Sequence, residues 1–184
     1  MIYSEEIPSR YVSTIRTLIR FAVAMAFVGL LSGLLFQESS KKLTYATAAP
    51  GLHLEATIRL ALLHGHVFLI GMIIPLCLAF AMVLARRIGG AAISPRGQAF
   101  LTRGYLPLAA IALGLMLYKA YHVLLAVRGG NSDLDAVYGD LFGGITSLRH
   151  AAYGLTHTGM SVCLAVFLVS LWRSLSPKNI RELP

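Results

Sequence analysis

The chain has 184 residues, of which 57% are hydrophobic and only 13% are charged. A soluble domain usually carries about 25% charged residues, so this composition argues against a soluble protein and favours one membrane-embedded domain. The formal net charge is +8, but the basic residues flank apolar segments instead of forming one stripe, which argues against a nucleic-acid-binding surface.

Apolar residues gather in four segments, each as long as the run of about 20 residues that crosses a bilayer. The predicted spans are residues 14–36, 57–84, 101–127 and 145–172. Pro75 and Pro107 fall inside the second and third spans, where a membrane helix tolerates proline with a kink. The sequence therefore predicts an all-α fold, a four-helix transmembrane bundle in a single domain over residues 1–184. Its polar connections are residues 37–56, 85–100 and 128–144.

Basic residues are unevenly divided between the two ends of the predicted spans. The richer side carries Arg10, Arg16, Arg20, Arg86, Arg87, Arg96, Arg103, Arg173, Lys178 and Arg181. The other side carries Lys41, Lys42, Arg59, Arg128 and Arg149, together with most of the acidic residues. Because cytoplasmic loops are enriched in lysine and arginine, we expect both termini and the middle connection to be cytoplasmic. The first and third connections then face outward.

Histidine is the residue type that carries chemistry in this sequence. Of the six histidines, His53 falls in the first predicted connection and the other five fall in predicted spans. Those five are His64, His66, His122, His150 and His157. Each lies within roughly 18 Å of the predicted outer end of its span at about 1.5 Å per residue. Ionisable residues inside a span are rare and usually mark function, so this outer cluster is the predicted site.

The spacing of the histidines divides them between faces. His64 and His66 are two residues apart, and such residues point about 200° away from each other on a helix. The two therefore serve different sites, or one binds a ligand while the other bonds elsewhere. His150 and His157 are seven residues apart and share one face. We expect a second site in which His64 faces His122 or His150.

Imidazole is a ligand for iron, copper and zinc. A b-type heme needs one or two axial histidines in an apolar cavity, and no C-x-x-C-H motif for covalent attachment is present. In a bundle with neighbouring helices about 10 Å apart, the diagonal of about 14 Å accommodates an iron between two imidazoles. Simple up-down order makes the second and fourth spans diagonal, which predicts His66 and His157 as the axial pair. Lys119, Arg149 and Arg59 are then near the heme propionates or lipid headgroups.

Two alternatives stay open beside heme b. One is a copper or zinc protein in which Glu38, near the outer end of the first span, joins the histidines as a ligand. The other is a non-catalytic membrane subunit whose histidines pack between helices. Whether the protein is an enzyme also stays open, as does a homo-oligomeric state. A quinone or a redox protein is the expected partner if the site transfers electrons.

Three stretches resemble a family of small four-helix bacterial membrane proteins of unknown function. They are G-L-L-S-G-L-L-F-Q-E-S-S-K at residues 29–41, L-L-H-G-H-V-F-L-I-G-M at residues 62–72 and G-L-T-H at residues 154–157. The resemblance implies a bacterial inner (cytoplasmic) membrane location and functional roles for Glu38, His64, His66 and His157. It implies none for His122 or His150. The H-G-H motif is also distantly similar to that of heme–copper oxidase and nitric-oxide reductase catalytic subunits.

Overall fold

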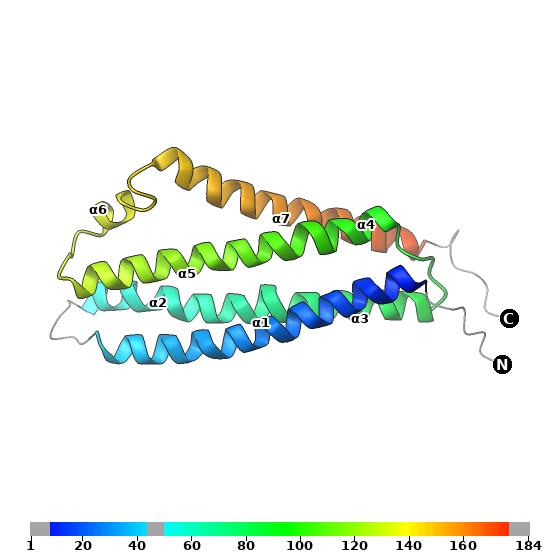
Figure 1. Cartoon of the computed structure of the whole chain (residues 1–184), viewed down its shortest axis with the longest axis horizontal. Helices are drawn as coiled ribbons and strands as arrows, with labels where there is room; N and C mark the ends of the chain where they lie inside the picture. Colours follow the sequence, from blue (N-terminus) through cyan, green and yellow to red (C-terminus); the bar gives the residue numbers. More distant parts are fainter. Residues whose placement is uncertain (1–7, 44–49, 177–184) are drawn as a thin grey trace.

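The computed structural model describes residues 8–43 and 50–176 and is helical throughout its main elements (Figure 1). The helices in chain order are α1 (Ser9–Lys41), α2 (Pro50–His66), η1 (Val67–Ile73), α3 (Ile74–Arg87), α4 (Pro95–Ala99), η2 (Phe100–Tyr105), α5 (Leu106–Arg128), α6 (Leu134–Gly139) and α7 (Thr146–Ser174). They form four continuous apolar rods that are long enough to cross a membrane, over residues 9–41, 51–87, 95–128 and 146–174. The prediction of an all-α, multi-pass membrane protein is confirmed.

Each rod is longer than its predicted span, because polar and basic residues at the ends continue the helix. The largest difference is at the start of the second rod, which begins at Pro50 and not at residue 57. Proline suits a first helical position because the N–H that it lacks would have no intrahelical partner there. His53, predicted in a loop, therefore lies in α2. The third connection, predicted as loop, contains the short helix α6.

The two prolines inside the spans follow wide π-helical turns. Pro75 comes just after η1, and Pro107 comes just after η2. A proline has no N–H to donate, so a carbonyl one turn earlier is left without its helical partner. The Ile70 carbonyl accepts a hydrogen bond from the Tyr105 hydroxyl at 3.1 Å instead. This bond connects the second rod to the third near the middle of the bundle.

We call the end of the bundle that holds the start of α1 and the end of α7 the terminal end, and the end that holds α6 the cap end. Helix α1 packs along α2, η1 and α3, helix α2 packs along α5, and α5 packs along α7. Near the terminal end α7 also contacts η2, α4 and α3. Among the described helices, α2 and α7 do not pack along each other. Figure 1 shows α7 diverging from α1 and α2 toward the cap end.

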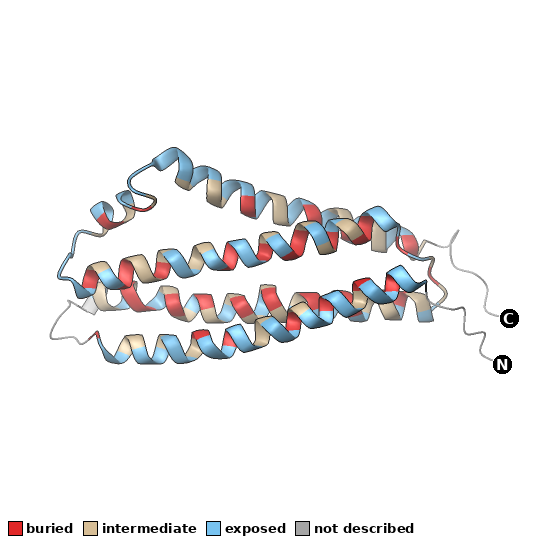
Figure 2. Ribbon diagram, in the orientation of Figure 1, coloured by how far each residue is buried: buried red, intermediate tan, exposed pale blue. Residues whose placement is uncertain are grey.

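Burial follows this divergence. One apolar cluster at the terminal end joins all four rods and includes Tyr11, Met82, Tyr105 and Phe167. A second cluster toward the cap end joins α2, α5 and α6 without a residue of α7. In Figure 2 the half of α7 nearer the cap end is mostly exposed. The bundle is therefore closed at one end and open along α7 at the other.

Candidate functional site

His64 makes a contact between α2 and α1. Its Nδ1 donates to the Gly29 carbonyl of α1 at 2.8 Å, and its ring meets Phe68 edge-on with 5.0 Å between centroids. A Cβ at Gly33 would lie 2.9 Å from the ring, so the small residue makes room for the imidazole. His64 faces α1, and the structure does not bring it together with His122 or His150 in the predicted second site.

His122 bonds to α6, which we call the cap. Its Nε2 lies 3.0 Å from the Val137 carbonyl of α6, and because a carbonyl only accepts, that nitrogen carries the proton. Its ring also lies 6.0 Å from that of Tyr118. This histidine therefore bonds α5 to α6 and is not oriented as a ligand.

His66 and His157 share a different arrangement. His66 Nδ1 donates to the Leu62 carbonyl at 2.7 Å, and His157 Nδ1 donates to the Tyr153 carbonyl at 2.8 Å. Each bond returns to the histidine's own helix, one turn earlier. The proton is then on Nδ1, so each Nε2 presents a lone pair. Within the described part of the chain, neither Nε2 atom has a hydrogen-bond partner.

The contacts of α5 place these two histidines at similar depth. Tyr153, one turn before His157, donates to the Leu115 carbonyl at 3.0 Å, and a Cβ at Gly159 would lie 3.0 Å from Leu108. His157 is therefore level with the stretch of α5 between residues 108 and 115. His66 is one turn toward the cap end from Ile70, which Tyr105 contacts. Both histidines therefore lie at the level of the middle stretch of α5.

At the cap end, α6 is joined to the bundle through Tyr138. The Tyr138 hydroxyl accepts from Arg59 Nε at 2.9 Å and donates to Glu55 Oε1 at 2.6 Å. Arg59 also pairs with Glu55. Arg149 of α7 donates to the Tyr138 carbonyl. Burial raises the pKa of Tyr138, and the bond to the Glu55 carboxylate raises it further, while Arg59 opposes both. One residue of α6 thus joins α2 and α7.

A chain of ring contacts leads from the cap down to His157. Tyr118 lies 5.2 Å from Phe142, Phe142 lies 6.1 Å from Tyr153, and Tyr153 lies 6.4 Å from His157, measured between ring centroids. Phe142 has a φ of 61°, which is uncommon for a residue with a side chain. Its N–H donates to the Tyr118 hydroxyl at 3.1 Å. The strained turn therefore inserts this ring between α5 and α7.

A cavity of about 500 Å³ lies between α5, the cap and α7. Its lining residues are Lys119, Tyr138, Leu141, Arg149, His150, Tyr153 and Gly154. His150 is exposed on its wall. Sequence reasoning noted the basic residues but missed Tyr138, because nothing in the sequence shows that the third connection folds back over the bundle.

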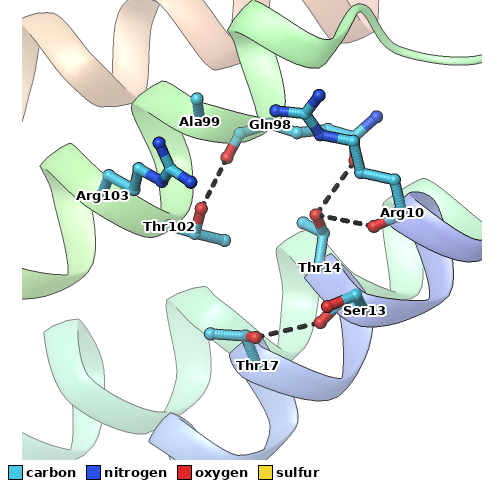
Figure 3. Close-up of a pocket in the computed structure, with 8 residues that line it drawn as sticks. All are labelled: Arg10, Ser13, Thr14, Thr17, Gln98, Ala99, Thr102 and Arg103. Atoms are coloured by element: carbon cyan, nitrogen blue, oxygen red, sulfur yellow. Dashed lines mark hydrogen bonds between the residues drawn. The ribbon is translucent and has the colours of Figure 1, made fainter.

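A second cavity, of about 390 Å³, lies at the terminal end between α1 and the α4–η2 region (Figure 3). Its wall is polar. The Thr14 hydroxyl bonds to Gln98 Oε1 at 2.9 Å, and Gln98 Nε2 donates to the Ile93 carbonyl at 2.8 Å. Arg10 and Arg103 also line it. This buried glutamine fixes the α1–α4 contact and was not predicted from the sequence.

Glu38, predicted to approach the histidines, pairs with a lysine of its own helix. Its carboxylate pairs with Lys41 at 2.7 Å, and its side chain is 62% exposed. A lysine three residues away on the same helix face is within easy reach, so the pair forms at the helix end instead. Nowhere in residues 8–43 and 50–176 do three or more histidine, cysteine, aspartate or glutamate side chains gather as a metal-ligand group.

Comparison of the chain with protein-family models, with curated proteins and with solved structures gives no match.

Proposed function

We propose that this protein binds a b-type heme in the half of the bundle nearer the cap end, for electron transfer or for redox chemistry with a small gas or oxidant. The observation that carries the proposal is that His66 and His157 have the same tautomer and the same kind of hydrogen bond. Each ring is oriented by an Nδ1–H bond to a backbone carbonyl, which is the usual support of an axial imidazole. Each Nε2 is left with a lone pair.

The donor set fits heme better than a closed metal site. A structural zinc site normally takes four protein ligands, and the described residues form no group of three. Heme iron needs one or two. Because α2 and α7 do not pack along each other, His66 and His157 are also candidates for single axial ligation. Copper or zinc is therefore the weaker alternative.

The surrounding residues have clear roles in this proposal. The carbonyls of Leu62 and Tyr153 hold the two imidazoles in one tautomer, and the Tyr153 ring packs beside His157. The heme itself would supply a reversible one-electron change at iron. A quinone or a redox protein is the partner class for such an electron carrier.

The proposal includes a bacterial inner membrane location with the cap end facing outward, because more of the basic residues lie at the terminal end. Reporter fusions to the C-terminus and within the connection near Asp133 test this orientation. We expect the C-terminal fusion to be active in the cytoplasm and the other outside it. The reverse pattern would contradict the orientation.

An absorbance spectrum of the purified protein tests heme binding directly. We expect a Soret band in the wild type and its loss or shift in His66→Ala, His157→Ala or the double variant. His64→Ala is the matched control, because it lies two residues from His66 but faces α1, and its spectrum should be unchanged. Absence of a Soret band in the wild type, or a wild-type spectrum in the double variant, would exclude this site. A stoichiometric metal without that band would favour copper or zinc.

A further inference from the structure

The cap end holds more positive charge than its acidic residues balance. Arg59 lies over the Tyr138 ring at 4.8 Å and Lys119 Nζ lies 5.2 Å from the same ring centre. Arg149 bonds to the Tyr138 carbonyl. The carboxylate that bonds to these residues is that of Glu55, and it already bonds to Arg59 and to the Tyr138 hydroxyl. Three cations therefore gather around one paired carboxylate.

Lys119 is the residue whose charge has no partner. In the described part of the chain its ammonium makes no hydrogen bond or ion pair, and it lies over the Tyr138 ring. It lies within the third membrane-spanning rod, partly buried. A charged side chain inside a span is costly and is normally paired with an opposite charge. An anion from outside the chain would supply the opposite charge that does not bond to Lys119 in the described residues.

The space for that anion is the cavity in front of Lys119. Arg149 and His150 share its wall, and Gly154 lines it from α7. A Cβ at Gly154 would meet nothing within 4 Å, so the cavity is not closed at this side. Its volume of about 500 Å³ lies within the range of small-ligand sites, about 300–1,000 Å³.

We propose that this cavity is a phosphate-binding site, filled by the headgroup of an anionic phospholipid or by free phosphate. A phosphate accepts several hydrogen bonds at once, which suits an arginine fork next to a lysine point charge. Lys119 supplies the ammonium, Arg149 supplies the guanidinium nitrogens that do not bond to Tyr138, and His150 adds an imidazole. The site does not depend on heme binding.

Calorimetric titration of the purified protein in neutral detergent tests the proposal. The probes are dihexanoyl-phosphatidylglycerol, dihexanoylglycerol without the phosphate, and inorganic phosphate. We expect binding of phosphatidylglycerol and none of dihexanoylglycerol. Equal affinity for inorganic phosphate assigns the site to the free ion, and binding of the lipid alone assigns it to a headgroup. Either result supports a phosphate site.

The variant that isolates the site is Lys119→Gln, because Lys119 makes no hydrogen bond that folding would lose. We expect its affinity to fall about tenfold, as loss of one charge-assisted bond implies, and Lys119→Arg to restore it. Arg128→Gln, a basic residue at the same end but outside the cavity, should stay within about twofold of wild type. Binding of neither phosphate probe, equal binding of dihexanoylglycerol, or wild-type affinity in Lys119→Gln would overturn the proposal. The His66→Ala, His157→Ala double variant should bind phosphatidylglycerol as the wild type does, because neither histidine lines the cavity, which separates this test from that of the proposed function.

Discussion

The two ends of this bundle are held together by different interactions. At the terminal end, large side chains from all four rods are fully buried, and the Tyr11 hydroxyl donates to the Met82 carbonyl at 3.1 Å across the core. Gly104 lets Cys163 approach so closely that a Cβ there would lie 2.5 Å from Sγ. At the cap end, α7 joins its neighbours mainly through Tyr153, Arg149 and the α6 cap.

This difference assigns separate roles to the two ends. Lipid tails are as apolar as leucine, so close packing and hydrogen bonds are what hold membrane helices together. The terminal end has both and forms a closely packed base. The cap end leaves space along α7, where the cavity lined by Lys119, Arg149 and His150 lies. A binding site can occupy that space without opening the base.

The largest expected effect is at the base. Phe167 of α7 is completely buried in the terminal cluster, so Phe167→Ala leaves a cavity that the neighbouring helices cannot fill. We expect the free energy of unfolding to fall by about 3 kcal/mol. Denaturant titration in detergent micelles, followed by circular dichroism, measures the change.

Phe80→Ala is the matched control, since Phe80 of α3 is 68% exposed at the apolar surface. It removes the same atoms without opening a core cavity. A change below about 1 kcal/mol is expected there. Equal losses in the two variants would show that burial at the terminal end is not what stabilises the bundle.

The fold could be predicted from the sequence for two reasons. Bilayer thickness sets the length of an apolar run that spans it, and a helix satisfies the backbone hydrogen bonds of that run in lipid. Helix ends could not, since Pro50 and the polar residues after it continue a helix that hydropathy alone ends near residue 57. The cap was missed for a similar reason. Residues 134–139 lack an apolar repeat of their own. Helix α6 forms because Asp133 caps it and because Tyr138 bonds it to α2.

The positions of the candidate histidines could be predicted only in part. Axial depth follows from residue spacing, so the sequence placed the histidines toward one end. Rotation about each helix axis and the order of neighbours do not follow from spacing, and they decide that His64 faces α1 while His122 bonds to α6. The up-down order assumed in the sequence analysis would place α7 beside both α5 and α1. In the structure α7 packs along α5 but not along α1. Spacing also did not predict that Glu38 pairs with Lys41 on its own helix.

A smaller effect is expected when the cap loses its anchor. Tyr138→Phe removes the hydroxyl that bonds to both Arg59 and Glu55. We expect a loss of about 1–2 kcal/mol, concentrated at the cap end. Hydrogen exchange over residues 134–139 should accelerate about tenfold, while exchange in α3 stays unchanged. An unchanged rate in α6 would show that the cap does not depend on this hydroxyl.

The same residue gives the cap a pH dependence. Burial and the Glu55 carboxylate raise the pKa of Tyr138, so folding favours the neutral phenol. The stabilisation is complete below the ordinary tyrosine pKa of about 10 and is lost as the pH rises through the raised value. A difference titration of tyrosinate absorbance, wild type minus Tyr138→Phe, should show one group titrating above that ordinary value. A group titrating at or below it would contradict the bonded arrangement.

The smallest effect is expected at His64, which lies toward the cap end but on the side of α2 that is closed by α1. Its Nδ1–H bond to the Gly29 carbonyl is a single contact between two helices, and such bonds in membranes contribute about 1 kcal/mol or less. His64→Ala should therefore lower the unfolding free energy by no more than about 1 kcal/mol. Gly33→Ala provides an independent measure of the same contact, since the added methyl would come within 2.9 Å of the imidazole and displace it from Gly29. If the ring contact is what both variants disturb, the double variant should lose less than the sum of the two single losses. Additive losses would mean that His64 and Gly33 act independently, and the assignment of His64 as the α1–α2 contact would be wrong.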